Sequence, residues 1–220
     1  IKDEHEKIEK IVASENISGI ISDNRYGLWS KKVKSVFITH QLNIQTPPSL
    51  KIFSPVLKKL NHNYISKFDE CWVPDFSEKN NLSGKLSEYK NKKLKIEYIG
   101  PLTRFEKPRD GFKKKYDLMG IVSGPEPQRS RFEKLLLNEF NQINKKCLLV
   151  CGKPNETEEK TVGNIEIVSH LSSQMMQEAI MEAEIIICRP GYSTIMDLAV
   201  LGKKALFVPT PGQTEQEYLA

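Results

Sequence analysis

Residues 184–202 read Glu184-Ile-Ile-Ile-Cys-Arg-Pro-Gly-Tyr-Ser-Thr-Ile-Met-Asp-Leu-Ala-Val-Leu-Gly202. The segment starts as a buried strand and turns at Gly191. It continues as a helix that Ser193 or Thr194 caps and that ends at Gly202. An apolar run at 205–208 follows at once. This order predicts a parallel strand-helix-strand crossover with its turn at the carboxyl end of the first strand.

Similar apolar runs, separated by helical segments, recur along the chain. Strands are predicted at 17–22, 35–39, 70–73, 96–99, 118–123, 147–151, 165–168, 185–188 and 205–208, and helices at 131–141 and 172–184. Such alternation predicts an α/β protein with parallel sheets. Because the runs are apolar rather than alternating, we expect strands that are covered on both faces.

The composition changes near the middle of the chain. Residues 100–115 combine prolines and glycines with many charged side chains, which is typical of a linker. Residues 1–100 hold 17 Lys and Arg against 12 Asp and Glu, whereas residues 101–220 hold 16 of each. We therefore predict two Rossmann-like domains that face a cleft, at 1–103 and 104–220, with the first domain incomplete.

The basic excess is steepest between Lys31 and Lys95, with 13 Lys against 5 acidic residues. A lysine-rich surface is either a solvated face or a site for anionic lipid, phosphorylated acceptors or nucleic acid. No basic motif with interleaved aromatics favours nucleic acid. No apolar run reaches the length of a membrane-spanning helix, so an integral membrane protein is not expected.

The cysteines indicate a reducing environment. Cys71, Cys147, Cys151 and Cys188 lie beside apolar residues, so we expect buried strand thiols and a cytoplasmic protein. The chain has no CxxC motif and no clustered His pair, so no metal site is expected.

The turn before the predicted helix can bind a nucleotide. Free amides and the helix dipole favour a phosphate there, and Asp197 shares the helix face of Ser193 and Thr194, where it can accept hydrogen bonds from a ribose diol. The same residues also fit an ordinary crossover, in which Ser and Thr cap the helix and Asp favours its dipole.

The ordered pattern from Arg189-Pro-Gly191 through Asp197 to Gly202, Pro209 and Gln216 resembles the donor signature of MurG-like family 28 glycosyltransferases. The resemblance implies the GT-B fold, a nucleotide-sugar donor as substrate, and no cofactor or metal. It implies that Asp197, where the family usually has Glu, holds the donor ribose. The implied donor site comprises Ser123, Gly124, Arg129, His170, Leu171, Arg189, Gly191, Tyr192, Ser193, Thr194, Asp197, Gln213 and Gln216.

Segments 20–27 and 37–41 resemble the acceptor-side loops of the same fold, which implies that Asp23, Arg25 and His40 face the acceptor. His40 is the candidate catalytic residue in this chain. The resemblance places the family's glycine-rich loop, which often carries the main base, before Ile1, and further helices after Ala220.

The resulting hypothesis is transfer of a hexose from a UDP-sugar to the hydroxyl of a lipid-linked or saccharide acceptor. We expect a cytoplasmic enzyme that is peripheral on the inner membrane face and binds no nucleic acid. A nucleotide-sugar epimerase or hydrolase of the same fold, or a non-catalytic nucleotide-sugar binding protein, would fit the same residues.

Overall fold

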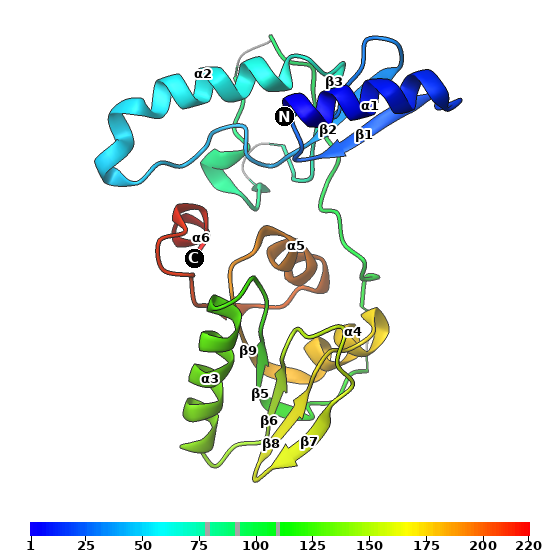
Figure 1. The fold of residues 1–220 in the computed structure, drawn as a ribbon. Coiled ribbons are helices and arrows are strands. Elements are labelled where there is room, and N and C mark those ends of the chain that lie inside the picture. Colours follow the sequence, from blue (N-terminus) through cyan, green and yellow to red (C-terminus); the bar gives the residue numbers. More distant parts are fainter. Residues whose placement is uncertain (78–79, 91–92, 109–110) are drawn as a thin grey trace. The chain divides into compact units, whose positions relative to one another are not determined.

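The computed structural model describes residues 1–77, 80–90, 93–108 and 111–220, which divide into a first unit, Ile1–Leu102, and a second unit, Thr103–Ala220. Each unit contains its own sheet with helices around it (Figure 1). The predicted α/β class with parallel sheets is confirmed. Parts of two predicted segments lie outside the described residues: Lys79 and Lys92 of the lysine-rich stretch and Arg109 and Asp110 of the linker.

The first unit is built on four parallel strands in the order β1-β2-β3-β4. They are β1 (Gly19–Asp23), β2 (Lys34–Ile38), β3 (Glu70–Val73) and β4 (Ile96–Tyr98), each within two residues of its predicted bounds. The connections carry the 3-10 helices η1 (Pro48–Phe53) and η3 (Gly84–Leu86) and the helix α2 (Ser54–Ile65). Phe37, Ile65 and Val73 form the centre of the core.

Strand β1 differs from the prediction of strands covered on both faces. Its residues alternate between exposed and buried, and the side chain of Ile21 is 64% exposed. The prediction was wrong here because β1 is an edge strand whose second face is not packed by the described residues. Helix α1 (Lys2–Ser14), which the sequence analysis did not single out, buries none of its residues fully.

The second unit has a six-stranded sheet in the order β10-β9-β5-β6-β8-β7. Its elements are β5 (Tyr116–Ile121), α3 (Gln128–Asn141), β6 (Cys147–Val150), β7 (Glu159–Val162), β8 (Ile165–Val168), α4 (Ser173–Glu182), β9 (Ala183–Cys188), α5 (Tyr192–Leu201), β10 (Ala205–Phe207) and α6 (Thr214–Leu219). All pairings are parallel except that of β7 with β8.

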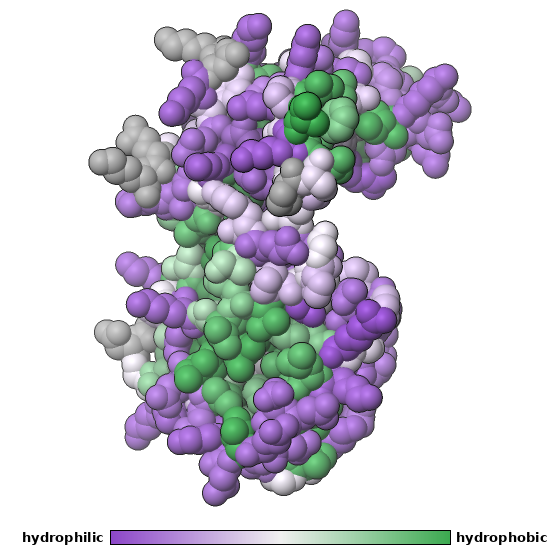
Figure 2. All heavy atoms as spheres, turned by 90° about the vertical axis from the view of Figure 1, so that its left-hand side faces the viewer, coloured by the Kyte–Doolittle hydropathy of each residue, from purple (hydrophilic) through white to green (hydrophobic). Residues whose placement is uncertain are grey.

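Helices cover the two faces of this sheet. Helices α4 and α5 pack on one face around Met119 and Ile186, and α3 packs on the other around Leu149. Beyond α3, β9 and β10 leave Ile185 and Leu206 about half exposed, and hydrophobic residues gather in the lower part of Figure 2. Side chains at alternate positions of a strand lie on the same face. Ile185 and Leu206 therefore lie on the face that α3 covers elsewhere.

Two boundaries correct the sequence analysis. Strand β9 begins at Ala183, so the helix predicted to reach residue 184 ends at Glu182. Helix α5 begins at Tyr192 with Gly191 as its N-cap, so Ser193 and Thr194 lie in its first turn and do not cap it. Its end at Gly202, which has a φ of 65°, is confirmed, as is the burial of all four thiols.

Candidate functional site

Most of the predicted donor residues lie in loops at the carboxyl edge of the second sheet. The parallel strands β5, β8, β9 and β10 end at one edge, and the loops that follow them carry Ser123 and Gly124, His170 and Leu171, Arg189 and Gly191, and Gln213 respectively. Because β9 pairs with both β5 and β10, three of these loops are neighbours. This edge is where open α/β sheets bind their ligands.

Asp197 lies on α5, one turn beyond its start, and is half-buried. Its Oδ1 accepts a hydrogen bond of 2.5 Å from Oγ1 of Thr103. Burial raises the pKa of this carboxyl, and the hydrogen bond from Thr103 and the charge of Arg104 counteract only part of the rise. Asp197 is therefore a partly desolvated hydrogen-bond acceptor.

Arg189 follows β9 and is only 7% exposed. Its Nη1 donates to the carbonyl oxygens of Val208 at 2.9 Å and Pro209 at 2.6 Å, and its guanidinium lies 4.2 Å from the ring centroid of Phe132. Burial lowers the pKa of the guanidinium. Arg189 thus links the carboxyl ends of β9 and β10. This structural role does not depend on a bound phosphate.

Arg129 is held in a network at the start of α3. Its guanidinium donates to Glu126, to Oε2 of Glu133 at 2.9 Å and to the carbonyl of Cys151 at 3.0 Å. Ser123 is exposed in the preceding loop. The guanidinium of Arg129 is thus hydrogen-bonded to two carboxylates, whereas Ser123 lies exposed at the surface.

The loop after β10 is closed by its own side chains. Oε1 of Gln216 accepts from the amide of Thr210 at 2.8 Å, and the amide of Gln213, whose side chain is exposed, donates to the carbonyl of Thr210 at 3.1 Å. In the loop after β8, exposed His170 has its Nδ1 2.9 Å from the carbonyl oxygen of Glu156. Leu171 packs against the α4 and α5 core.

The predicted acceptor-side residues lie at the carboxyl edge of the first sheet. Asp23 pairs in register with Ile38, so the loops that follow β1 and β2 are adjacent. Oγ1 of Thr39 donates to Oδ1 of Asn24 at 3.2 Å and joins them. His40 is half-buried directly after this contact, whereas exposed Arg25 forms an ion pair with Glu4 at 2.6 Å.

A buried carboxylate near this edge was missed by the sequence analysis. Asp75, after β3, is fully buried and accepts hydrogen bonds from the amides of Phe76, Leu82 and Ser83 and from the hydroxyls of Ser83 and Ser87. Burial raises the pKa of Asp75, but these hydrogen bonds outweigh it, and the net shift is downward. Asp75 therefore fixes Phe76, Leu82, Ser83 and Ser87 within the loop that follows β3.

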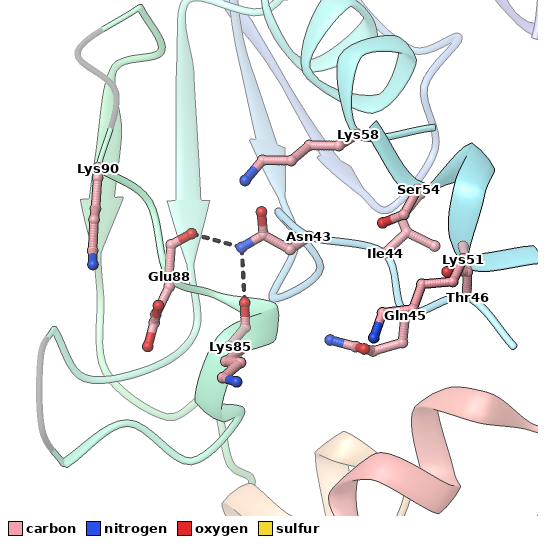
Figure 3. Close-up of a pocket in the computed structure, with 10 residues that line it drawn as sticks. All are labelled: Asn43, Ile44, Gln45, Thr46, Lys51, Ser54, Lys58, Lys85, Glu88 and Lys90. Carbon is pink, nitrogen blue, oxygen red and sulfur yellow. Dashed lines mark hydrogen bonds between the residues drawn. The ribbon is translucent and has the colours of Figure 1, made fainter. Parts of the chain in front are cut away.

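This loop forms one wall of a cavity of about 590 Å³, which we call the lysine hollow (Figure 3). It is lined by Asn43, Ile44, Gln45, Thr46, Lys51, Ser54, Lys58, Lys85, Glu88 and Lys90. The excess of lysines between Lys31 and Lys95 indicates a cationic site in the sequence. The lining residues come from three separate segments, however, which only the fold brings together. Among the described residues, no group of three His, Cys, Asp or Glu side chains is placed to hold a metal ion.

Residues 127–220 match the model of the glycosyltransferase family 28 C-terminal domain. The match contains the whole Arg189 to Asp197 pattern, so the resemblance predicted from that pattern is confirmed. A comparison with curated protein sequences gives no match.

Three solved structures share the fold over nearly the whole chain. Arabidopsis thaliana UGT89C1 complexed with UDP-L-rhamnose has a TM-score of 0.62 at 12% identity over 99% of this chain and 59% of its own. Acinetobacter baumannii MurG has a TM-score of 0.54 at 14% identity over 98% of this chain and 58% of its own. A protein named as a UDP-N-acetylglucosamine 2-epimerase from Listeria monocytogenes has a TM-score of 0.53 at 11% identity over 98% of this chain and 66% of its own. The chain thus spans less than two thirds of each.

Proposed function

We propose that this chain, whose residues 127–220 form a glycosyltransferase family 28 C-terminal domain, is part of an enzyme that transfers a hexose from a UDP-sugar to an acceptor hydroxyl. The family match across the β9–α5 turn is the observation that carries the proposal. The uridine diphosphate would lie at the carboxyl edge of the second sheet, with its ribose on Asp197 and its phosphates at the start of α5. We assign the diphosphate mainly to the first-turn amides of α5, because Arg189 already donates to two carbonyl groups.

The proposed reaction is a direct displacement at the anomeric carbon. A base removes the proton of the acceptor hydroxyl, the oxygen attacks the anomeric carbon, and the bond to the diphosphate breaks so that UDP leaves. The α5 amides stabilise the developing charge on the diphosphate without a metal ion or a cofactor. On the acceptor side, His40 is the candidate base within this chain.

The Listeria protein named as an epimerase makes a nucleotide-sugar epimerase the second candidate, and a hydrolase would use the same donor site. A non-catalytic nucleotide-sugar binding protein is the third. Incubation with a radiolabelled UDP-sugar separates them, because a transferase consumes donor only with an acceptor. An epimerase changes the donor by itself, a hydrolase releases free sugar, and a binding protein leaves the donor intact.

Calorimetric titration tests the donor site. UDP is expected to bind at least about tenfold more tightly than uridine, because the phosphates contact the α5 amides. Asp197→Ala should weaken UDP binding by about 1 to 3 kcal/mol through loss of the ribose hydrogen bonds. The melting temperature of the variant should differ little from that of the wild type. Burial raises the pKa of Asp197, so above the pKa of the unfolded state its charged carboxylate does not stabilise the folded state.

Asp117→Ala is the matched control, since this carboxylate lies near the amino end of β5, away from the proposed site. Equal UDP affinity in the wild type and Asp197→Ala would contradict the ribose role. Equal affinity for UDP and uridine would contradict the diphosphate role of the turn.

We also propose that the first unit binds an anionic membrane surface. The side chains of Leu50, Ile52, Phe53, Val56 and Leu60 on η1 and α2 are 48 to 81% exposed, and Lys51 and Lys59 lie between them in the sequence. A hydrophobic area is also visible in the upper part of Figure 2. Exposed apolar side chains with flanking lysines suit the interface of an anionic bilayer. No described helix is long and apolar enough to span a membrane.

Co-sedimentation with vesicles tests this surface. The protein should sediment with phosphatidylglycerol-containing vesicles at low salt, since each lysine near the surface contributes about 1 kcal/mol. Binding should fall as the screening length drops from about 10 Å at about 0.1 M salt to about 3 Å at about 1 M. Ile52→Ser with Phe53→Ser should reduce it, whereas Leu206→Ser in the second unit is the control. Absence of the wild type from the vesicle pellet at low salt would show that the lysines are a solubility surface.

A further inference from the structure

We propose that the lysine hollow binds the phosphate group of a phosphorylated saccharide and that this saccharide is the acceptor. That the saccharide is the acceptor rests on the proposed function, whereas phosphate binding in the hollow is a property of this chain alone. The hollow lies beside the carboxyl ends of β2 and β3, and its first lining residue, Asn43, follows the candidate base His40 by three residues. Its location therefore agrees with a site for the acceptor.

The charge of the hollow is not neutralised by the protein. Lys32 pairs with Glu9, and Lys34 and Lys95 pair with Glu70 elsewhere in the first unit. In contrast, Lys51, Lys58 and Lys90 form no ion pair with any residue that the structure describes. These three ammonium groups, Lys85 and the single carboxylate of Glu88 leave a net positive lining. Lysines that are already paired need no ligand, whereas Lys51, Lys58 and Lys90 leave cationic charge available to an anion.

The lysines line the hollow from different elements. In Figure 3, Lys51 and Lys58 extend from η1 and α2, and Lys85 and Lys90 extend from the segment after β3. A dianionic phosphate can contact several ammonium groups at once, which a monoanionic carboxylate does less well. This arrangement favours a phosphate over a carboxylate as the anionic group.

Asn43 fixes the wall of the hollow and also suits a hydroxyl-rich ligand. Its Nδ2 donates to the carbonyl oxygens of Lys85 at 2.8 Å and Glu88 at 2.7 Å, which joins the loop after β2 to the loop that Asp75 organises. Its Oδ1 is buried and accepts no hydrogen bond from the described residues. A buried oxygen without a donor costs free energy, and a saccharide hydroxyl would supply the donor.

The remaining lining agrees with a saccharide. Thr46 and Ser54 contribute hydroxyls, Gln45 an amide and Glu88 a carboxylate, all of which bind sugar hydroxyls. A volume of about 590 Å³ lies in the ordinary range of small-ligand sites. A bare phosphate would leave most of this space and these polar groups unused, so the hollow fits a phosphorylated sugar better than inorganic phosphate.

Calorimetry on the whole chain at low, fixed ionic strength tests the proposal with glucose 1-phosphate, glucose and inorganic phosphate as probes. Glucose 1-phosphate should bind at least about tenfold more tightly than either of the other two. Lys58→Gln should weaken that binding by about tenfold. Lys59→Gln, which removes the same charge from the next residue of α2 outside the hollow, should leave it within about twofold of the wild type.

Equal losses in Lys58→Gln and Lys59→Gln would overturn the site, because they would indicate a general charge effect. Equal binding of inorganic phosphate and glucose 1-phosphate would overturn the saccharide part. A water-soluble, short-chain phosphatidic acid separates the sources of phosphate without presenting the membrane surface proposed above, and a Lys58-dependent preference for it over glucose 1-phosphate would overturn a sugar ligand in favour of a lipid headgroup. UDP binding by Lys58→Gln should equal that of the wild type, so failure of the donor site would be recognised separately.

Discussion

Replacement of Asp75 by alanine is expected to lower the free energy of unfolding of the first unit by about 3 to 5 kcal/mol. The wholly buried carboxylate accepts five hydrogen bonds, and its removal leaves three amides and two hydroxyls without an acceptor. Urea denaturation followed by tryptophan fluorescence measures this directly, because Trp29 and Trp72 both lie in the first unit.

Glu97→Ala, which removes an exposed carboxylate from β4, is the matched control and should change the stability little. The effect of Asp75 should also depend on pH. Since its folded pKa is lowered, its contribution is complete above the unfolded pKa of about 3.9 and is lost as the pH falls through the folded pKa. A loss for Asp75→Ala no larger than that for Glu97→Ala would show that the loop is held by other contacts.

Gly152→Ala should destabilise the second unit by about 3 kcal/mol. Gly152 follows β6 with a φ of 65°, and a Cβ there would lie 2.3 Å from the carbonyl oxygen of Val122. No rotation of a side chain can relieve contact with a backbone oxygen, so the loop that leads to Ser123 and Gly124 must move. UDP binding should weaken as well, because that loop belongs to the predicted donor site.

Gly163→Ala is the control for this substitution. Gly163 has a similar φ of 60°, but nothing lies within 4 Å of a Cβ added there, so the control isolates the conformational cost. Hydrogen exchange of β5 and β6 measures the stability of the second unit, and tryptophan fluorescence should show the first unit unchanged. Equal loss of protection in the two variants would indicate that the contact with Val122 is relieved at little cost.

The β9–α5 crossover could be predicted from sequence because its signals are local: an apolar run, Gly191 at the turn and Gly202 at the helix end. The surroundings of Arg189 could not, because Phe132, Val208 and Pro209 come from other segments. The bond from Thr103 to Asp197 likewise joins residues 94 positions apart.

Strand β7 was missed because all four of its residues are exposed and two are charged, so hydrophobicity gives no signal. The dipeptide Gly163-Asn164, which connects it to β8, is a recognised hairpin signal. Helix α1 was missed for a related reason: it buries no residue fully, so its apolar positions do not mark a core-facing stripe. The lysine hollow depends on segments that meet only after folding.

The buried cysteines make the folded chain chemically silent towards thiol reagents. Burial raises the pKa of Cys71 and Cys188 to about 12 and that of Cys151 to about 11, and Cys147 is shifted in the same direction. Hardly any thiolate therefore exists near neutral pH, and alkylating reagents react with thiolate. A cysteine introduced at an exposed position such as Ser193 would then take up a fluorophore or spin label selectively, with all four native cysteines left in place.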